Sequence, residues 1–352
     1  MTAPKRSRAA LRAMAWLIIS ATLGLNACAG HQQSAIDPRG PQAGNIAGLW
    51  WFFLWVLTAI FIVVMALTLW TLVRRNRDLQ QDSLETMHLP SDQTEAKLAR
   101  VVASATLATV LILFVLLGAS IFVGKSVAEL GIPKGGMVIE LTGNQWWWQV
   151  QYDNPDASQV LVTANEIHIP VGRPVMILGR SNDVIHSFWV PNLHGKRDLI
   201  PSRATTEWIQ AAQPGAFRGQ CAEFCGLQHA HMALWVIAEP EPAFDAWMAQ
   251  QRQPAVPPSD PIKQRGQQVF LSNACEYCHT IRGTAAAGQV APDLTHFASR
   301  RGIAANTLPN TMGNLGGWIL DPQSIKPGTH MATIALPTED LQPLLEYLES
   351  LK

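Results

Sequence analysis

The sequence has no excess of charge of either sign and few charged residues of any kind. Its 352 residues include 26 basic and 26 acidic side chains, and charged residues make up only 15% of the chain. This balance lacks the basic excess that is typical of nucleic-acid-binding proteins, so no nucleic-acid partner is expected. The length leaves room for about two or three domains.

Cysteine is also scarce, and its spacing argues against a disulfide framework. The five cysteines are Cys28, Cys221, Cys225, Cys275 and Cys278. An odd number, arranged as one isolated residue, a C-x3-C pair and a C-x2-C pair, indicates three separate kinds of chemistry.

The N-terminal part of the chain begins like an export signal. Residues 1–27 have basic residues near their start and then an uncharged, mostly apolar stretch from Ala13 to Ala27. The stretch ends in Leu-Asn-Ala-Cys, which resembles the bacterial lipobox and predicts cleavage before Cys28 and its acylation. An ordinary signal peptide followed by an incidental cysteine is the alternative. Residues 28–47 are then the exported N-terminal segment.

Two long uncharged runs follow, at Gly48–Val73 and Val101–Gly124. At about 1.5 Å per residue, either run can cross a hydrocarbon core of about 30 Å. Buried core helices are the alternative, but such helices rarely exclude charge over so many residues. We therefore expect transmembrane helices at 48–73 and 101–124.

The loop between these runs, residues 74–100, predicts their orientation. It carries more Lys and Arg close to the helix ends than the outer flanks do, so it is expected to face the cytoplasm. Everything after residue 125 then lies outside the cytoplasm, which agrees with the export signal. The expected location is the bacterial inner membrane.

Residues 132–240 change to short β-branched stretches separated by Gly, Pro and Asn, which favours a single all-β domain. The strand candidates are Met137–Leu141, Val160–Val162, Glu166–Ile169, Val175–Leu178 and Leu234–Ile237.

Residues 219–232, GQCAEFCGLQHAHM, carry a dense set of soft metal ligands. The candidate ligands are His186, Cys221, Glu223, Cys225, His229 and Met232. Thiolates, imidazoles and a thioether select copper over magnesium, calcium or manganese. Two thiolates four positions apart can bridge two copper ions, each capped by a histidine. Met232 and the backbone carbonyl of Glu223 then serve as weak axial ligands.

Simpler sites use parts of the same set. The two cysteines could form a disulfide in an exported protein. A mononuclear blue-copper site needs one cysteine, and zinc accepts two cysteines with two histidines. The complete string together with the upstream His186 favours two coppers. His231 lies outside the motif, and His168 and His194 are expected to be structural.

These residues closely resemble the CuA motif of cytochrome c oxidase subunit II. The aromatic run Gly143–Tyr152 and the segment with Lys196 and Asp198 are similar to the same family. The resemblance covers about residues 45–240 and implies a cupredoxin β-sandwich with a binuclear CuA centre.

The family resemblance also assigns roles to two single residues. It implies that the carboxylate of Glu223 reaches a magnesium ion at the interface with subunit I; a solvent-exposed glutamate is the alternative. It implies that Trp146 accepts electrons, whereas Trp147 and Trp148 are expected to be structural aromatic residues.

Residues 241–262 are expected to be a linker, proline-rich over Gln251–Pro261, which leads to a C-terminal domain at 263–352. There, Cys275, Cys278 and His279 form a C-x-x-C-H motif, the signature of covalent haem c attachment. The cysteines would form thioethers and the histidine would be the proximal iron ligand. Expected helices at 263–273 and 338–351 resemble the terminal pair of an all-α class I cytochrome c.

The sixth haem ligand is expected to be Met331. Residues 318–331, WILDPQSIKPGTHM, are similar to a segment of oxidase-fused cytochromes that ends in the ligand methionine, although Ala332 stands where proline commonly follows. A methionine ligand raises the haem potential. Met312 and His330 are the alternatives.

The expected protein is therefore a transmembrane helix hairpin, a cupredoxin sandwich and a cytochrome c domain. The resemblance implies electron transfer from an external cytochrome c or other periplasmic donor, through haem c and CuA, to haem a and CuB in subunit I. Subunit III would complete the oxidase, which reduces dioxygen and pumps protons. The alternative is the CuA-bearing subunit of a nitric oxide reductase. The intact copper motif excludes a quinol oxidase subunit, and the haem motif argues against a copper-delivery protein.

Overall fold

The computed structural model describes residues 32–78, 92–128 and 136–352. The chain divides into two compact units, Gly44–Leu130 on the one hand and Met1–Ala43 with Gly131–Lys352 on the other. The expected signal peptide, Cys28 and half of the expected 74–100 loop lie outside the described residues.

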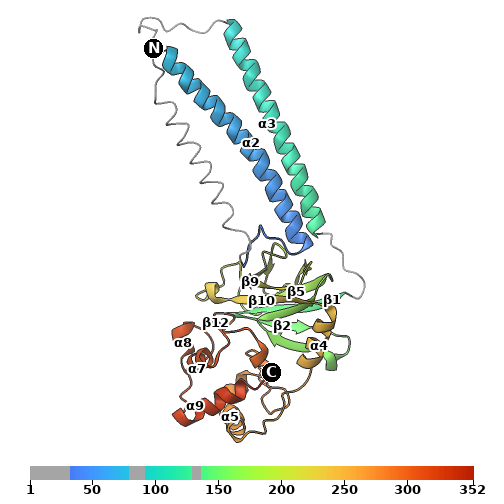
Figure 1. Ribbon diagram of the computed structural model, residues 1–352, viewed down its shortest axis with the longest axis vertical. Coiled ribbons are helices and arrows are strands. Elements are labelled where there is room, and N and C mark those ends of the chain that lie inside the picture. The colour runs from blue at the N-terminus through green and yellow to red at the C-terminus, as the bar shows by residue number, and fades with distance from the viewer. Residues whose placement is uncertain (1–31, 79–91, 129–135) are drawn as a thin grey trace, which may run out of the picture. The chain divides into compact units, whose positions relative to one another are not determined.

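The first unit is formed by two long helices, α2 (Pro41–Asp78) and α3 (Asp92–Ala128) (Figure 1). Both are long and apolar enough to cross a membrane, and most of their apolar side chains are exposed. The helices extend beyond the expected spans at each end. In α3, for example, Asp92 and Glu95 lie in the first turn and Lys125 in the last, where each charge complements the helix dipole.

The second unit begins with a β domain, residues 136–251. Its larger sheet has five strands in the order β3-β2-β1-β5-β8. Their bounds are β1 Met137–Asn144, β2 Trp147–Tyr152, β3 Leu161–Ala164, β5 Val175–Ser181 and β8 Thr205–Ile209. Burial alternates along β2, where Trp148, Val150 and Tyr152 point into the core. This period of two is what a sheet with one buried face requires.

The smaller sheet of the β domain has the order β4-β10-β9. Its strands are β4 (Glu166–Pro170), β9 (Gly215–Gln220) and β10 (Ala233–Glu239). A separate ribbon pairs β6 (His186–Trp189) with β7 (Lys196–Leu199). The two sheets share one core, so the expected all-β sandwich is present. The strand predicted at Val160–Val162 begins one residue later, at Leu161.

The expected linker at 241–262 differs from the structure in its first half. Residues Glu241–Gln251 form helix α4, whose Phe244 and Met248 are buried in the core of the β domain. Proline is tolerated in the first helical turn because the N–H that it lacks has no partner there in any case, so Pro242 does not prevent this helix. The irregular connection therefore covers only residues 252–260.

The C-terminal domain, residues 261–352, is helical (Figure 1). Its helices are α5 (Pro261–Ser272), α6 (Cys275–Cys278), α7 (Met312–Leu320), α8 (Pro322–Ile325) and α9 (Thr338–Leu348). Helices α5 and α9 cross closely at Gly266, where a Cβ atom would collide with the Pro343 carbonyl and the Tyr347 side chain. A short hairpin joins β11 (Gly302–Ile303) to β12 (Leu308–Pro309).

Candidate copper and haem sites

The predicted copper ligands lie on two neighbouring segments of the β domain. His186 is the first residue of β6, and Cys221 directly follows β9. The remaining ligands lie on the loop between β9 and β10. Backbone hydrogen bonds from Cys221 N to Met232 O (2.9 Å) and from Ala222 N to Ser187 O (3.0 Å) close this loop and tie it to β6.

The structure brings all six predicted ligands into one cluster. The two sulfur atoms of Cys221 and Cys225 are 3.7 Å apart. His186 Nδ1 lies 3.9 Å from the Cys221 sulfur, and His229 Nδ1 lies 3.5 Å from the Cys225 sulfur. Met232 Sδ is 3.8 Å from Cys225 Sγ, and the Glu223 carbonyl is 3.3 Å from Cys221 Sγ. One imidazole therefore serves each thiol, as a binuclear centre requires.

The electrostatics of the paired thiols favour a bound cation. The pKa of Cys221 is lowered to about 4, because its thiolate accepts hydrogen bonds from Cys225 and His186. The pKa of Cys225 is raised, because it shares its proton with Cys221 and because it is buried. Two thiolates this close repel each other unless positive charge lies between them. The buried, soft donor set therefore fits copper.

Further residues hold His186 in the orientation that the cluster needs. Its Nε2 lies 2.7 Å from Asp183 Oδ1, which leaves Nδ1 directed at the thiols. Asp183 is itself held by the backbone N–H of Gln145, 2.6 Å from Oδ2. A Cβ atom at Gly143 would lie 2.6 Å from the imidazole ring, so glycine provides the space for it. Carboxylate partners of this kind orient metal-binding histidines.

The carboxylate of Glu223 points away from the cluster and is partly exposed. Its Oε2 accepts a hydrogen bond from Lys196 Nζ at 2.9 Å, and Lys196 also lies 3.5 Å from Asp198. The residue therefore presents its carbonyl to the thiols and its carboxylate to a charged surface.

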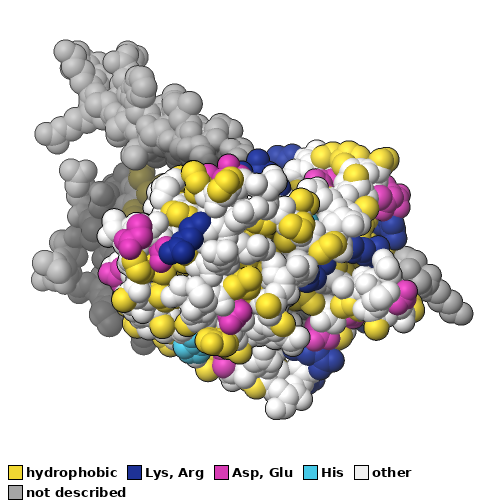
Figure 2. Space-filling view, turned by 90° about the horizontal axis from the view of Figure 1, so that it is seen from below, with side chains coloured by type: hydrophobic (Ala, Val, Ile, Leu, Met, Phe, Trp, Pro, Cys, Tyr) yellow, Lys and Arg dark blue, Asp and Glu magenta, His cyan; other side chains and the backbone are white. Residues whose placement is uncertain are grey.

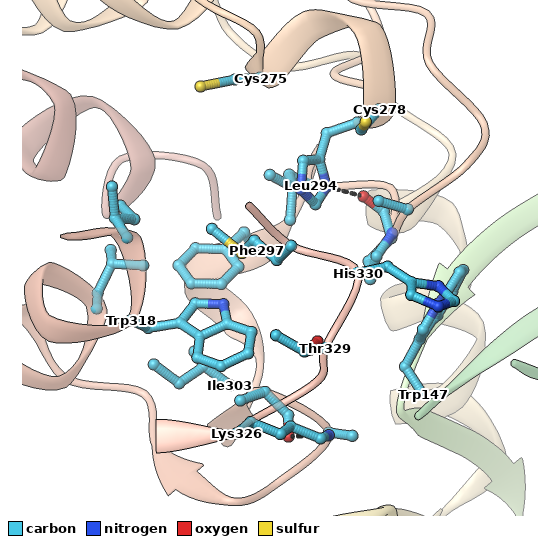
Figure 3. A pocket seen from close by; sticks show the side chains of 18 of the residues that line it. Trp147, Cys275, Cys278, Leu294, Phe297, Ile303, Trp318, Lys326, Thr329 and His330 are labelled. Atoms are coloured by element: carbon cyan, nitrogen blue, oxygen red, sulfur yellow. Dashed lines mark hydrogen bonds between the residues drawn. The ribbon is translucent and has the colours of Figure 1, made fainter. Parts of the chain in front are cut away.

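A cavity of about 260 Å³, formed mainly by the C-terminal domain and closed on one side by the β domain at Trp146 and Trp147, is lined by the predicted haem ligands Cys275, Cys278, His279 and Met331. Figure 3 shows Cys275 and Cys278 at one end of it, with Trp318 and Ile303 on the wall. The two cysteines form no disulfide with each other. The apolar lining includes Phe270, Leu294, Phe297, Leu315 and Leu344. This combination of thiols, imidazole, thioether and apolar wall fits a covalent haem.

His279 is prepared to bind iron through one nitrogen. Its Nδ1 lies 2.8 Å from the carbonyl oxygen of Pro292, to which it can donate, so Nε2 remains for a metal. Burial lowers the pKa of His279, which keeps the imidazole neutral.

The structure favours Met331 over Met312 as the sixth ligand. Met331 lines the cavity, whereas the sulfur of Met312 lies 3.8 Å from the Gln342 amide. The Met331 loop is braced by Gln323, whose Nε2 donates to Thr329 O (2.8 Å) and Met331 O (2.9 Å). His330 also lines the cavity, but its ring lies beside Trp146, 6.5 Å between centroids.

Trp146 contacts both sites. Its indole N–H donates to the carbonyl of Cys225 at 2.9 Å, and the residue also lines the haem cavity. It is only 7% exposed, so a separate protein could not dock directly on its ring. Trp148 is fully buried in the core, as expected of a structural residue, and Trp147 lines the cavity.

In the seam between the β domain and the C-terminal domain, most hydrogen bonds join a side chain of one domain to a main-chain group of the other, as between Asn306 Nδ2 and Asn165 O at 3.1 Å. Ala233 N donates to Ala305 O at 3.1 Å, and Arg301 N donates to Glu166 Oε1 at 2.6 Å. Residues Ala304–Asn306, between β11 and β12, have φ values of 52°, 56° and 59°, in the left-handed region. This turn presents the Ala305 carbonyl and the Asn306 side-chain amide to the β domain.

Sequence reasoning missed the role of Lys326. Its ammonium group donates to Trp146 O at 2.8 Å and Ala304 O at 3.0 Å, and the side chain is 2% exposed. Burial lowers the pKa of Lys326 to about 7. Lys326 belongs to the segment that resembles oxidase-fused cytochromes. The sequence does not indicate which groups its ammonium binds.

Three further histidines of the β domain pair with side chains other than the predicted copper ligands. His168 Nδ1 lies 3.0 Å from Glu239, and its ring stacks on Trp247. His194 Nδ1 lies 2.9 Å from Glu207. His231 lies 2.7 Å from Gln228 Oε1. His168 and His194 therefore have side-chain partners of the kind expected of structural histidines, and His231 hydrogen bonds within the loop that carries the copper ligands.

Comparison with known proteins agrees with both sites. Residues 154–239 match the family described as cytochrome c oxidase subunit II, periplasmic domain, and residues 263–352 match cytochrome c. Cytochrome c oxidase subunit 2 of Alkalihalophilus pseudofirmus is 34% identical over 334 residues, which is 94% of each chain. The same subunit of Bacillus sp. PS3 is 33% identical and covers 65% of this chain and 66% of its own.

Among solved structures, the periplasmic domain of subunit II of cytochrome oxidase from Bradyrhizobium japonicum is 31% identical. It covers 35% of this chain and 97% of its own, with a TM-score of 0.32.

A copper-binding β-sandwich joined to a cytochrome c domain and a pair of apolar helices defines a membrane-anchored electron-transfer protein. The chain belongs to the cytochrome c oxidase subunit II family, in the form that carries a C-terminal cytochrome c domain. It is thus part of a haem-copper oxidase complex that uses CuA and haem c. The nitric oxide reductase alternative is not favoured.

Proposed function

We propose that this chain accepts electrons at a haem c in its C-terminal domain and passes them through Trp146 to CuA, and from there to subunit I. The observation that carries the proposal is the double contact of Trp146, which lines the haem cavity and donates to Cys225. The bound haem and copper pair supply the one-electron carriers that the side chains alone do not provide.

The residues of this chain would divide that work as follows. Cys275 and Cys278 would hold the haem covalently, and His279 and Met331 would bind its iron. The copper ligands would be His186, Cys221, Cys225, His229, Met232 and the carbonyl of Glu223. Asp183 keeps the His186 ring in place, so little rearrangement is needed when the charge of the cluster changes.

The proposed partners follow from the family. Subunit I would hold haem a and CuB, where dioxygen is reduced and proton pumping is driven, and subunit III would complete the assembly. The carboxylate of Glu223 would contribute to a magnesium site facing subunit I. Its exposure and its link to Lys196 and Asp198 support a role at a polar interface.

An external cytochrome c or other periplasmic donor would reach the C-terminal domain rather than Trp146, which is covered. Figure 2 shows one face of the described part of the chain, on which basic, acidic and apolar side chains are interspersed. Strong electrostatic steering of a highly charged donor is therefore not expected at that face.

The proposed location is the bacterial inner membrane, with residues 125–352 on the outer side and Cys28 as a lipid anchor. Reporter fusions after residue 130 should be active in the periplasm, and fusions within residues 80–95 should be silent there. The reverse pattern would contradict the topology. Mass analysis of the N-terminal peptide tests whether Cys28 is acylated.

The central test is made on the purified complex. It should contain two coppers in CuA and one haem c per copy of this chain, and it should consume oxygen. Electron transfer from haem c to CuA should follow a rate that is independent of protein concentration, because both sites lie on one chain. A rate that rises in proportion to concentration would contradict the internal route.

A further inference from the structure

Lys326 is a buried amine that, within the described chain, donates only to main-chain carbonyls, with Cys225 as the nearby group that favours its charged form. Its ammonium group donates to two carbonyl oxygens, those of Trp146 and Ala304. Among the described residues, Lys326 is in no ion pair with a carboxylate. An ammonium group has three N–H donors, and burying it without a negative partner is costly. One donor therefore remains for an acceptor outside the chain's own residues.

The position of Lys326 in the cavity identifies the acceptor. Figure 3 shows Lys326 at the end of the cavity opposite Cys275 and Cys278. A haem c is attached to its cysteines through the two former vinyl groups, and its two propionates lie on the opposite edge of the ring. A haem bound to Cys275 and Cys278 therefore directs its carboxylates to the end where Lys326 lies.

Arg300 is a second buried cation on the wall of the same cavity. Its Nη2 donates to the Thr163 hydroxyl at 3.3 Å and to the carbonyl of Asp293, and its Nε has no partner within the described chain. The cavity thus offers two cationic side chains to a ligand that brings two carboxylates.

We propose that Lys326 binds a propionate of haem c and so links the haem directly to the main chain of Trp146. This inference rests on the proposed haem site. The same nitrogen then contacts the haem carboxylate and the Trp146 carbonyl, while the Trp146 indole donates to Cys225. Lys326 is a positioning residue that fixes the haem edge relative to the copper cluster.

The link has a measurable consequence for the haem. A cation next to a propionate offsets its negative charge, which favours the reduced haem because that form carries one positive charge less. Lys326→Met, which keeps the length but removes the charge and the donors, should lower the reduction equilibrium constant of haem c about tenfold. For a one-electron couple this corresponds to about 59 mV.

The experiment compares Lys326→Met with Lys263→Met, the same change on helix α5, in the full chain carrying haem and copper. Spectroelectrochemical titration gives the haem potential, and redox-induced infrared difference spectra report the propionate carboxylate. The proposal expects a lower potential and a shifted carboxylate band for Lys326→Met alone. It is overturned if either quantity matches that of Lys263→Met.

Lys326→Gln serves if the methionine variant does not fold, since glutamine keeps a neutral donor. It should lower the potential in the same direction, and an unchanged potential would again overturn the link. A wild-type chain without covalent haem would overturn the proposed function as well. If the wild-type chain carries haem and copper but substitution of Lys326 changes neither the haem potential nor the carboxylate band, only this inference is overturned.

Discussion

Removing the side chain of Gln323 should detach Met331 from the haem iron in a measurable fraction of molecules. Gln323 donates to Thr329 O and Met331 O at 2.8 and 2.9 Å, and accepts from Gly328 N at 2.9 Å. Each such bond contributes about 0.5–1.5 kcal/mol. Because Gln323 is only half-buried, we expect Gln323→Ala to remove about 2 kcal/mol of the free energy that stabilises the Met331 loop.

This loss acts on the loop that presents the methionine. At about 1.4 kcal/mol per tenfold change, 2 kcal/mol shifts the equilibrium between attached and detached methionine about 30-fold. The methionine-to-iron charge-transfer band of the oxidised haem should therefore weaken, and the haem potential should fall because a methionine ligand raises it. The covalent haem should remain, since Cys275 and Cys278 hold it.

Gln342→Ala is the matched control, because Gln342 lies 3.8 Å from the sulfur of the rival ligand Met312. It should leave the band and the potential unchanged. A weakened band in Gln342→Ala together with a normal band in Gln323→Ala would refute the assignment of Met331 and favour Met312.

Three further predictions concern the β domain. Cys221→Ser should reduce the copper content from two to at most one, with a mononuclear signal in electron paramagnetic resonance; retention of two coppers would contradict the bridging role. Asp183→Asn should weaken copper binding about 10- to 100-fold in a chelator competition, because it frees the His186 ring. Burial opposes the charged form of His168, but Glu166 and Glu239 outweigh it and raise its pKa. Its stabilising effect should be complete below the unfolded value of about 6.5 and lost as pH rises through the folded pKa; thermal unfolding of His168→Gln should lack this dependence.

The copper ligands could be predicted because most of them are close in sequence. Cys221, Cys225, His229 and Met232 lie on one short loop, so any fold that closes the loop gathers them. His186 lies 35 residues before Cys221, and the hydrogen bond from Ala222 N to Ser187 O brings β6 beside the loop. The family resemblance supplied that residue; spacing alone would not have done so.

The role of Lys326 could not be predicted for the same physical reason. Its partner carbonyls belong to Trp146, 180 residues away, and Ala304, 22 residues away. Every residue has a backbone carbonyl, so the sequence does not show which carbonyl accepts a given hydrogen bond. Helix α4 was included in the expected linker, although its Pro242 is tolerated in a first helical turn.

The contacts between the β domain and the C-terminal domain suit a cytochrome domain that donates electrons within the same chain. A connection of residues 252–260 keeps this domain at a high effective concentration next to the β domain, so the contacts between them need little affinity. What they must provide is a constant position, because the proposed electron route depends on the place of Trp146 relative to the haem. Side chains that bind main-chain carbonyls across the seam, such as Asn306 Nδ2 with Asn165 O, fix this position together with the backbone hydrogen bond from Ala233 N to Ala305 O. Lys326, held by two carbonyls, extends the same principle into the haem cavity.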